Sequence, residues 1–539
     1  MKKRVLSILC CASLIMLNAC MGDSGTTSKP DDESLSESVV ETIESQEESI
    51  APPAIPEDYT EIFLDEKAGE NTFGVSVEFD PHFLSQNVKK GLVSEDDWQI
   101  IVDRVEKMEI DRFRVMLMPS WIEPFNDNSD DSSINWDNLT LESEEMKSVY
   151  KVLDLAQANG IDVNLTLWGV ENNANVIDSE INATIKSQGG HFLAEDNEGS
   201  SHWMIGTHKP EEFAENFSIY IQHLINNKGY DCIKEITPYN EPDMGYLIDG
   251  QISFEGYADL CQKLHDRFVA DGIRDKVLFT LSDNIDIHRN WLTSTMENLD
   301  DITDIYSSHT YIFGYETENS EIEGWEEENI NVTRYTGKPH VVGEFGSNLT
   351  IGSSRQSDID EYERGVLIVR EMLNFYNAGA AGSSYWVLFD QYYSYTDPYD
   401  SMMQLGLWKS SKQSYYTDTS YYEKITEDYE VRPQYYAFSL MSKYLPKGAE
   451  VYPIYLDDDF AVGTAFKGKD GKWVYVFANG NNEGSKKLAL YANGTFDMYQ
   501  YLETALPTGD NLIEKSGTSS NGLLAFDLQA QSVVVFVHK

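Results

Sequence analysis

The sequence is short of positive charge. Its 539 residues contain 40 Lys and Arg against 91 Asp and Glu, a formal net charge of −51. A protein that neutralises nucleic-acid phosphates needs the opposite sign, so this balance argues against a nucleic-acid partner. It is compatible with a neutral ligand, although an acidic surface also keeps a protein soluble and identifies no ligand by itself.

Cysteine is also scarce, with five residues, and the sequence has no CxxC or HExxH pattern. These absences argue against a zinc site. We therefore predict an activity that uses no cofactor and no metal. Cys232 and Cys261 lie in the region expected to fold; they could form a disulfide, although two buried thiols are the commoner arrangement.

One acidic stretch needs separate consideration as a calcium site. It contains Asp127, Asn128, Asp130 and Asp131, close behind an apolar run. It lacks the central Gly and the final Glu of the twelve-residue calcium loop. We expect a solvated loop rather than a metal site.

Long apolar runs are absent except at the N-terminus. There, Lys2, Lys3 and Arg4 precede an apolar stretch that ends in Leu17-Asn18-Ala19-Cys20. This pattern predicts a signal peptide over residues 1–19, too short for a stable membrane span. Its end resembles the bacterial lipoprotein box, which implies lipidation of Cys20 and a protein anchored by lipid outside the cytoplasm, at the cell surface. An ordinary signal peptide with an incidental cysteine is the alternative.

Residues 20–58 are poor in aromatic side chains and rich in Asp, Glu, Ser and Thr, and they end near the string APPAIP. Such a composition cannot bury enough apolar surface to fold. We predict a disordered acidic linker that extends from the anchor.

Residues 59–445 alternate between short apolar runs and amphipathic helical patterns. The apolar runs begin at residues 73, 112, 161, 236, 276, 305, 338 and 382. Eight strands regularly separated by helices predict an α/β fold, a (β/α)8 TIM barrel, rather than an open doubly wound sheet.

The pattern changes in residues 446–539 to short alternating strands with turn residues between them. Asp470-Gly471 separates two such strands and is a strong hairpin signal. We predict a C-terminal antiparallel β-sandwich domain. The stretch 59–70, around Ile62, is a candidate for an additional strand of this sandwich.

Two glutamates stand at the ends of predicted barrel strands. Glu241 follows the fourth apolar run in Asn240-Glu241-Pro242, and Glu344 follows the seventh in Gly343-Glu344-Phe345-Gly346. Glycoside hydrolysis needs two such carboxyl groups, one as proton donor and one as nucleophile or base.

The order of these motifs resembles clan A of the glycoside hydrolases, the retaining barrel enzymes that include families 5, 30 and 39. The resemblance covers roughly residues 70–440 and is carried by Asn240-Glu241-Pro242, His309-x-Tyr311, Glu344 and Trp386 on strands four, six, seven and eight. The appended sandwich is similar to that of families 30 and 39, whereas the string around Glu344 resembles family 5. The resemblance implies that Glu241 is the acid/base and Glu344 the nucleophile.

Further site residues are expected around this pair. We predict that Arg114 lies beside Glu344 and lowers its pKa, and that Tyr311 donates a hydrogen bond to Glu344. Asn240 is expected to bind the sugar 2-hydroxyl. His309 is expected to orient the acid or bind a hydroxyl group, with a satisfied core histidine as the alternative. Trp386 and Trp168 are candidate platforms for a sugar ring, with barrel packing as the alternative.

We predict a monomeric retaining hydrolase of β-linked oligo- or polysaccharides. Gluco- or xylo-configured sugars are favoured over manno- or galacto-configured ones, but no residue in the sequence decides between them. Two rivals remain at this point. A non-catalytic, surface-anchored glycan-binding protein could keep the barrel as a scaffold, and a transglycosylase would use the same residues.

Overall fold

The computed structural model describes residues 53–85, 93–123, 127–128, 130, 132–167, 193–195, 201–203, 210–243, 253–285, 289–312, 314–347, 359–392, 402–410, 427–520 and 522–539. Residues from Pro52 onward form one compact unit. The predicted signal peptide, the lipidation site Cys20 and most of the predicted linker lie outside the described residues.

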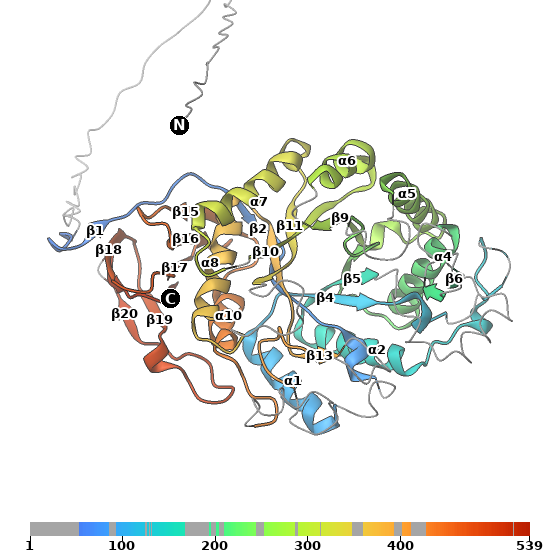
Figure 1. Ribbon diagram of the computed structural model, residues 1–539, viewed down its shortest axis with the longest axis horizontal. Coiled ribbons are helices and arrows are strands. Elements are labelled where there is room, and N and C mark those ends of the chain that lie inside the picture. Colours follow the sequence, from blue (N-terminus) through green and yellow to red (C-terminus); the bar gives the residue numbers. More distant parts are fainter. Residues whose placement is uncertain are drawn as a thin grey trace, which may run out of the picture. The chain divides into compact units, whose positions relative to one another are not determined.

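Eight parallel strands close into a barrel (Figure 1). Around the barrel they are β10 (Ile305–Ile312), β11 (His340–Ser347), β12 (Gly382–Tyr385), β3 (Gly74–Glu78), β4 (Arg112–Leu117), β5 (Asp162–Leu167), β8 (Ile233–Thr237) and β9 (Leu278–Ile285). The predicted eight-stranded barrel is confirmed. In such a barrel the carboxyl ends of all strands meet at one rim, which is where active sites lie.

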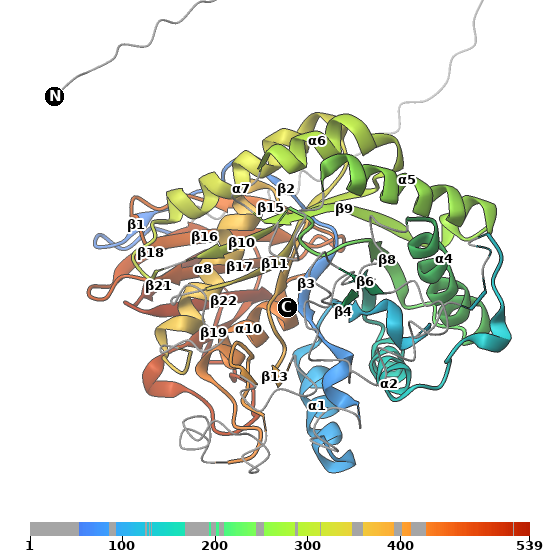
Figure 2. The same ribbon diagram turned by 45° about the vertical axis from the view of Figure 1, so that its right-hand side comes forward.

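Each barrel strand is followed along the chain by a helix (Figure 2). The helices are α1 (Glu95–Met108), α2 (Glu144–Asn159), α4 (Pro210–Ile221), α5 (Phe254–Ala270), α6 (Arg289–Leu299), α7 (Asn319–Thr333), α8 (Glu363–Ala378) and α10 (Pro433–Tyr444). Local signals fix several of their ends. Ser94 and Asp97 form a capping box at the start of α1, and Gly160 ends α2 in the left-handed conformation, with φ 68°.

The C-terminal part forms two packed sheets. The smaller sheet has the order β1 (Thr60–Glu61), β18 (Lys486–Tyr491), β21 (Leu523–Leu528). The larger has the order β2 (Gly69–Asn71), β15 (Ala449–Ile454), β16 (Ala461–Lys467), β17 (Trp473–Asn479), β22 (Ser532–His538), β19 (Phe496–Tyr501), β20 (Gly517–Ser519). All pairs are antiparallel except β1 with β18, and Asp470 and Gly471 lie in the turn between β16 and β17. The predicted sandwich is confirmed.

The segment that precedes the barrel belongs to the sandwich. Thr60 pairs with Leu488 on β18, and Asn71 pairs with Ala449 on β15. Between these pairs Ile62 is buried in the apolar core that the two sheets enclose. The chain therefore adds one strand to each sheet before it enters the barrel.

Barrel and sandwich share helix α8. Every residue of α8 after Glu363 is buried, including the charged Arg364, Arg370 and Glu371. Tyr362, just before the helix, stacks on Tyr501 of β19 with ring centroids 4.5 Å apart, and the Tyr501 hydroxyl donates to the Tyr362 carbonyl at 2.8 Å. A helix that is buried on all sides joins the two layers into one core.

Two short hairpins complete the described elements. They are β6 (Leu193–Glu195) with β7 (Ser201–Trp203), and β13 (Gln391–Tyr392) with β14 (Met402–Met403).

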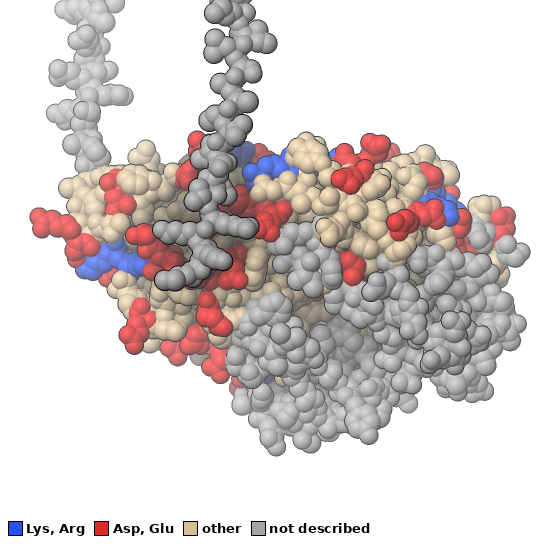
Figure 3. Space-filling view, turned by 45° about the horizontal axis from the view of Figure 1, so that its top comes forward, with Lys and Arg blue, Asp and Glu red and all other residues tan. Residues whose placement is uncertain are grey.

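Cys232 and Cys261 are both free and buried, so the disulfide considered from the sequence does not form. No helix among the described residues combines the length and the apolar character needed to cross a membrane. On the face drawn in Figure 3, acidic side chains outnumber basic ones over the described surface, in line with the acidic composition.

Candidate active site

Six of the predicted site residues converge at the carboxyl ends of the barrel strands. Arg114 lies on β4, Asn240 and Glu241 follow β8, His309 and Tyr311 lie on β10, and Glu344 lies on β11. His309 pairs directly with Glu344 in the register of β10 and β11. Trp386 follows β12, and Trp168 lies outside the described residues.

The two glutamates form a close pair. Glu241 and Glu344 are 8% and 6% exposed, and one carboxylate oxygen of each lies within 4.8 Å of the other and of a ring nitrogen of His309. Carboxyl groups about 5 to 5.5 Å apart suit a retaining glycosidase, whereas an inverting enzyme needs about 6.5 to 9.5 Å to admit a water molecule. The spacing matches the retaining geometry.

The backbone at Glu241 is held in a costly conformation. Its φ is 44°, in the left-handed region, and its N–H donates to the carbonyl of Asp283 at 3.1 Å. A residue other than glycine stays in this region only where its surroundings fix it, and such residues cluster at functional sites. The neighbouring strand β9 therefore fixes the position from which Glu241 projects.

Glu344 has hydrogen-bond donors on both carboxylate oxygens. The Tyr311 hydroxyl donates to Oε1, and Arg114 Nη1 donates to Oε2 at 3.3 Å. Burial and the charge of Glu344 raise the pKa of Tyr311 well above its usual value, so the phenol keeps its proton for this bond. The predicted contacts of Arg114 and Tyr311 with Glu344 are both present.

The two glycines beside Glu344 make room for this arrangement. A Cβ atom on Gly343 would lie 2.1 Å from Ser307 Oγ and 2.8 Å from Asp283 Oδ1. A Cβ atom on Gly346 would lie 3.4 Å from Cε1 of Tyr311. The string Gly343-Glu344-Phe345-Gly346 thus allows side chains from β9 and β10 to approach the β11 backbone.

His309 connects Glu241 with Asp283. Its Nδ1 lies 2.8 Å from Glu241 Oε1 and its Nε2 lies 3.1 Å from Asp283 Oδ1. Burial alone would lower the pKa of His309, but Asp283, Glu344 and the hydrogen bonds to Asp283 and Glu241 raise it well above its usual value. His309 is therefore a cation that donates from Nδ1 to Glu241 and forms an ion pair with Asp283 through Nε2.

Arg114 is the second cation of the site, with 1% of its surface exposed. Beyond Glu344 it binds Glu78 Oε2 at 2.7 Å and Asp283 Oδ2 at 2.8 Å. Its Nη2 also donates to Asn240 Oδ1 at 2.6 Å. Because the Asn240 oxygen is used in this way, its amide NH₂ is the group left to bind a ligand.

Glu78 and Asp283 are site residues that the sequence reasoning missed. Both are 1% exposed, and each ends an apolar run at the carboxyl side of a barrel strand. A carboxyl group that closes a buried strand is a signal that could have identified them. Burial would raise the pKa of Asp283, but Arg114 and His309 lower it well below the usual value of an aspartate, so it is ionised.

The pKa of Glu344 differs from the expectation. Burial raises it to about 8, and the charges of Glu241 and Glu78 act in the same direction, whereas His309 and Arg114 oppose the rise. Arg114 does stabilise the anion, as predicted, but the loss of solvent outweighs it. The carboxyl group of Glu344 therefore keeps its proton up to about pH 8 in the free protein.

Metal binding at the site is disfavoured by charge. Glu241, His309 and Glu344 are the only group of three or more potential ligands that lie together among the described residues. A protonated His309 is not a ligand, and Arg114 adds a second positive charge beside the same carboxylates.

The acidic stretch after β4 also needs a correction. Asp127 is buried rather than solvated, and its Oδ2 accepts from the Asn135 N–H. Asp130 is exposed and accepts from the hydroxyl of Ser132 at 2.6 Å, as in an ordinary loop. Asp131 lies outside the described residues.

Trp386 is 5% exposed and packs with Val387, Leu405 and Tyr311. Its small exposed area leaves its role as a sugar platform a prediction.

The amino-acid sequence matches no family model and no curated protein. Solved structures resemble the fold over most of its length, and those named below come from barrel glycoside hydrolases. The chain thus has the fold of that class of enzymes.

Three of these structures show the extent of the likeness. A glycoside hydrolase family 30 subfamily 8 xylanase from Clostridium acetobutylicum matches 89% of this chain and 99% of its own, with 14% identity and a TM-score of 0.55. An endo-β1,6-glucanase matches 90% of this chain and 96% of its own, with 16% identity and a TM-score of 0.54. A family 39 β-xylosidase from Caulobacter crescentus matches 89% and 99%, with 14% identity and a TM-score of 0.53. Families 30 and 39 are the two whose appended sandwich the sequence resembles.

Proposed function

We propose that the protein is a retaining glycoside hydrolase that cleaves β-glycosidic bonds of oligo- or polysaccharides. The observation that carries the proposal is the pair of buried carboxyl groups at one rim of the barrel, with oxygens of Glu241 and Glu344 within 4.8 Å. The fold, shared with xylanases and a β1,6-glucanase, supports the same reaction class.

In the first step, Glu344 attacks the anomeric carbon while the glycosidic C–O bond breaks and Glu241 gives its proton to the leaving oxygen. The product of this step is a covalent ester between Glu344 and the sugar. In the second step, Glu241 removes a proton from a water molecule, whose oxygen attacks the anomeric carbon and releases Glu344.

The surrounding residues have distinct roles in this reaction. Tyr311 and Arg114 orient the carboxylate of Glu344 for attack, and His309 orients Glu241. Asn240, fixed by Arg114, is positioned to donate to the sugar 2-hydroxyl, a contact that strengthens in the oxocarbenium-like transition state.

The substrate is proposed to be a neutral, β-linked glycan with gluco- or xylo-configured sugars. The acidic composition supports a neutral substrate over an anionic one. Structural neighbours described as xylanases, a β-xylosidase and a β1,6-glucanase point to the same group of sugars.

We also propose that the protein acts outside the cytoplasm, attached to a bacterial membrane through lipid on Cys20. The proposal rests on the basic start, the apolar run and Leu17-Asn18-Ala19-Cys20. Replacement of Cys20 by Ser should move the protein from the membrane fraction to the soluble fraction, and an unchanged distribution would contradict the anchor.

The central test is hydrolysis of a panel of aryl β-glycosides by the wild type, Glu344→Gln and Glu241→Gln. Glu344→Gln should lower kcat by at least about 10⁴-fold, because the variant cannot form the covalent intermediate. Glu106→Gln, an exposed glutamate on α1, is the matched control and should keep full activity.

Three outcomes separate the proposal from its rivals. Activity of Glu344→Gln equal to the wild type, or no hydrolysis of any substrate by the wild type, would favour the non-catalytic binding protein. A first product of inverted anomeric configuration, seen by proton NMR, would refute the retaining mechanism. Sugar transfer to a second sugar rather than to water would identify a transglycosylase.

A further inference from the structure

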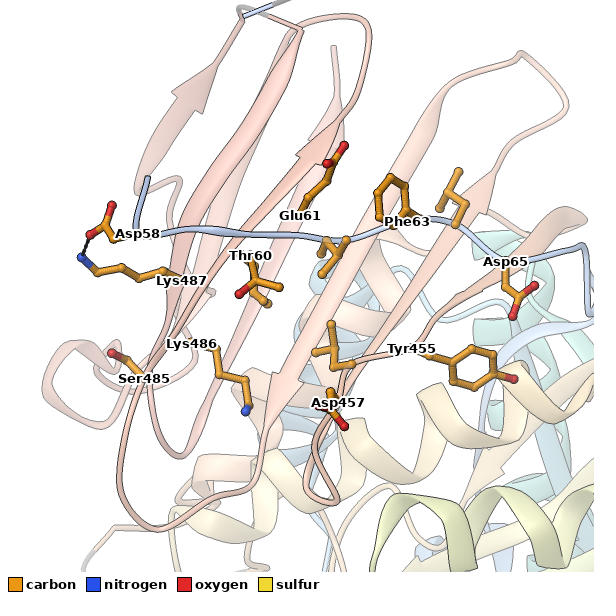
Figure 4. A pocket seen from close by; sticks show the side chains of 14 residues that line it. Asp58, Thr60, Glu61, Phe63, Asp65, Tyr455, Asp457, Ser485, Lys486 and Lys487 are labelled. Atoms are coloured by element: carbon orange, nitrogen blue, oxygen red, sulfur yellow. Dashed lines mark hydrogen bonds and ion pairs between the residues drawn. The ribbon is translucent and has the colours of Figure 1, made fainter. Parts of the chain in front are cut away.

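The described surface is hollowed where the N-terminal segment crosses the sandwich. A hollow of about 800 Å³ lies between residues 58–65, residues 455–457 and residues 485–488 (Figure 4). A second hollow of about 420 Å³ lies between residues 454–462 and the first turns of α7. Both are lined by Tyr455, Leu456 and Asp457, so the two hollows adjoin along this segment, and we call them together the furrow.

The furrow carries exposed aromatic rings. Phe63 is 65% exposed and Tyr455 is 55% exposed, and in Figure 4 they come from the two segments that flank the larger hollow. Three of the seven exposed large apolar side chains among the described residues line the furrow, the third being Leu64 at 37%. Exposed aromatic side chains concentrated around a hollow favour a binding surface over chance exposure.

The position of Tyr455 is fixed from the barrel side. Its hydroxyl donates to Oε1 of Glu323 on α7 at 2.9 Å, and Glu323 lines the smaller hollow. The hydrogen bond restrains the orientation of the ring, and the exposed part of the ring can stack against a flat apolar surface.

The polar lining selects against an anionic ligand. The carboxyl groups of Asp65, Asp457, Glu323 and Glu327 line the furrow. The two lysines of the lining are already paired, Lys486 with Asp458 at 2.6 Å and Lys487 with Asp58. Carboxylates accept hydrogen bonds from hydroxyl groups, but they repel phosphates and other carboxylates. A neutral, hydroxyl-rich ligand fits both the rings and the charge.

The smaller half of the furrow lies against the helix that follows a catalytic strand. Helix α7 follows β10, the strand that carries His309 and Tyr311, and its first N–H, that of Asn319, donates to the carbonyl of Asp459 at 2.8 Å. The turn between β15 and β16 therefore contacts the first residue of α7. From there the furrow leads away over the sandwich to β1 and β18.

We propose that the furrow is a second glycan-binding site, which holds a neutral polysaccharide chain against the Tyr455 ring while another part of the same polymer occupies the barrel. This inference rests on the proposed glycosidase function. The site would increase the residence of polymeric substrates near the barrel and would leave small substrates unaffected.

The test uses the full chain in a Glu344→Gln background, so that bound polymer is not cut. Retention is measured by electrophoresis in native gels that contain xylan or β-glucan. Tyr455→Ala and Phe63→Ala should each weaken retention by about 3- to 10-fold, the range of one lost aromatic contact. Tyr455→Phe, which keeps the ring, should retain its affinity. Tyr335→Ala, which removes a tyrosine 73% exposed outside the furrow, is the matched control.

A second readout separates this site from the catalytic one. With Glu344 intact, Tyr455→Ala should raise KM for the polymer and leave kcat/KM for an aryl β-glycoside unchanged. Equal retention by Tyr455→Ala and Tyr335→Ala, or no retention of either neutral polymer, would contradict the proposal that the furrow binds glycan. If the protein retained polygalacturonate or anionic phospholipid vesicles but neither xylan nor β-glucan, the proposed preference of the furrow for a neutral glycan would also be contradicted. If the protein hydrolyses the polymer equally well with and without the Tyr455 ring, the furrow proposal fails and the glycosidase proposal stands. If Tyr455→Ala weakens retention but the wild type hydrolyses no substrate, the glycosidase proposal fails instead.

Discussion

At the scale of single residues, Asp283 links the two cations of the site. Its Oδ2 binds Arg114 at 2.8 Å and its Oδ1 lies 3.1 Å from His309 Nε2. Its own backbone is in the left-handed region, with φ 48°, next to Ser282 with φ 78°. Because Asp283 is only 1% exposed and both of its carboxylate oxygens contact these cations, we regard it as a positioning residue that keeps His309 charged.

We predict that Asp283→Asn lowers kcat on aryl β-glycosides by about 10- to 100-fold and moves the pH–rate profile to higher pH. Without Asp283, the largest of the charges that raise the pKa of His309 is gone, so this pKa falls and the positive charge of His309 is held less strongly. That charge opposes the rise in the pKa of Glu344, which burial already brings to about 8, so the pKa of Glu344 should rise further. The pH dependence of kcat/KM is the measurement.

His309→Gln provides the comparison, since it removes the same charge and should shift the profile in the same direction. In the wild type, activity should rise as pH approaches about 8, because Glu344 loses its proton over this range and can then attack the anomeric carbon. A lower melting temperature for Asp283→Asn with an unchanged pH profile would show that Asp283 is only structural.

At the scale of elements, the approach of β9 and β10 to β11 depends on Gly343. We predict that Gly343→Ala lowers activity by at least about 10-fold, because its methyl group would lie 2.1 Å from Ser307 Oγ and must displace residues beside Glu344. Aryl glycoside kinetics together with a melting curve give the measurement.

Gly324 on α7 is the matched control for this substitution. A Cβ atom there meets nothing within 4 Å, so Gly324→Ala should keep activity and stabilise the helix by about 0.5 to 1 kcal/mol. If Gly343→Ala were as active as Gly324→Ala, the close approach at Gly343 would have no role in the site.

A second element-scale feature is the group of buried acids between the end of β4 and helix α4. Glu123 accepts from the Asp127 N–H and from Asn216 Nδ2, each at 3.0 Å, and Glu215 lies 3.4 Å from Arg267. Burial and the charge of Glu212 raise the pKa of Glu123 to about 9. Burial raises the pKa of Glu215 to about 8, although Arg267 opposes the rise.

These shifts predict a fall in stability as pH rises. The folded protein holds these protons up to about pH 8 to 9, whereas an unfolded glutamate releases its proton near its usual pKa of 4.5. The contribution of these two groups to the free energy of unfolding is complete below about pH 4.5. It decreases by up to about 1.4 kcal/mol per pH unit for each group as pH rises, and it is lost above about pH 9. Urea unfolding of the wild type and Glu123→Gln between pH 5 and 9 tests this, since the variant should show a shallower decline. Identical slopes would contradict it.

Regular strand and helix patterns explain why the barrel and most of its site were predictable. In a closed parallel barrel the carboxyl ends of all strands share one rim, so Glu241 and Glu344, about a hundred residues apart, could be placed together from the sequence. Glu78 and Asp283 were missed because their role depends on contacts with Arg114, which Glu78 makes from the neighbouring strand and Asp283 makes across the barrel. The left-handed backbone at Asp283 has no signature in the sequence.

Two other elements give only weak signals in the sequence because of their composition or length, although the strand predicted around Ile62 is present. Helix α7 is rich in Asn and Glu, and its few fully buried apolar side chains, Ile322 and Ile330, give only a weak amphipathic pattern. Strand β1 has two residues and gains its position through Ile62, which packs into the core of the sandwich. The disulfide could not be decided from spacing alone, because the barrel sets the separation of Cys232 and Cys261.

At the scale of the whole molecule, the barrel and the sandwich should unfold together. They share α8, and the segment before the barrel supplies β1 and β2 to the two sheets of the sandwich. We predict a single calorimetric transition, which Ile62→Ala should shift as a whole by about 2 to 5 kcal/mol of unfolding free energy, because it leaves a cavity at a residue 5% exposed.

The neighbouring Phe63→Ala is the control, because Phe63 is 65% exposed and its loss should change the unfolding free energy by less than about 0.5 kcal/mol. Two separate transitions, with only one of them shifted by Ile62→Ala, would show that the sandwich folds independently of the barrel.

The way the chain enters the fold has a mechanical consequence. Any pull on residue 53 first reaches contacts at the outer edge of the sandwich: the bond from the Tyr491 hydroxyl to the Pro53 carbonyl at 3.0 Å, and then the two residue pairs that join β1 to β18. Only after these, and after β2 has separated from β15, would tension reach β3 and the barrel. Strands β1 and β2 would therefore detach from the sandwich before the barrel is loaded, and the catalytic residues would keep their positions while they do so.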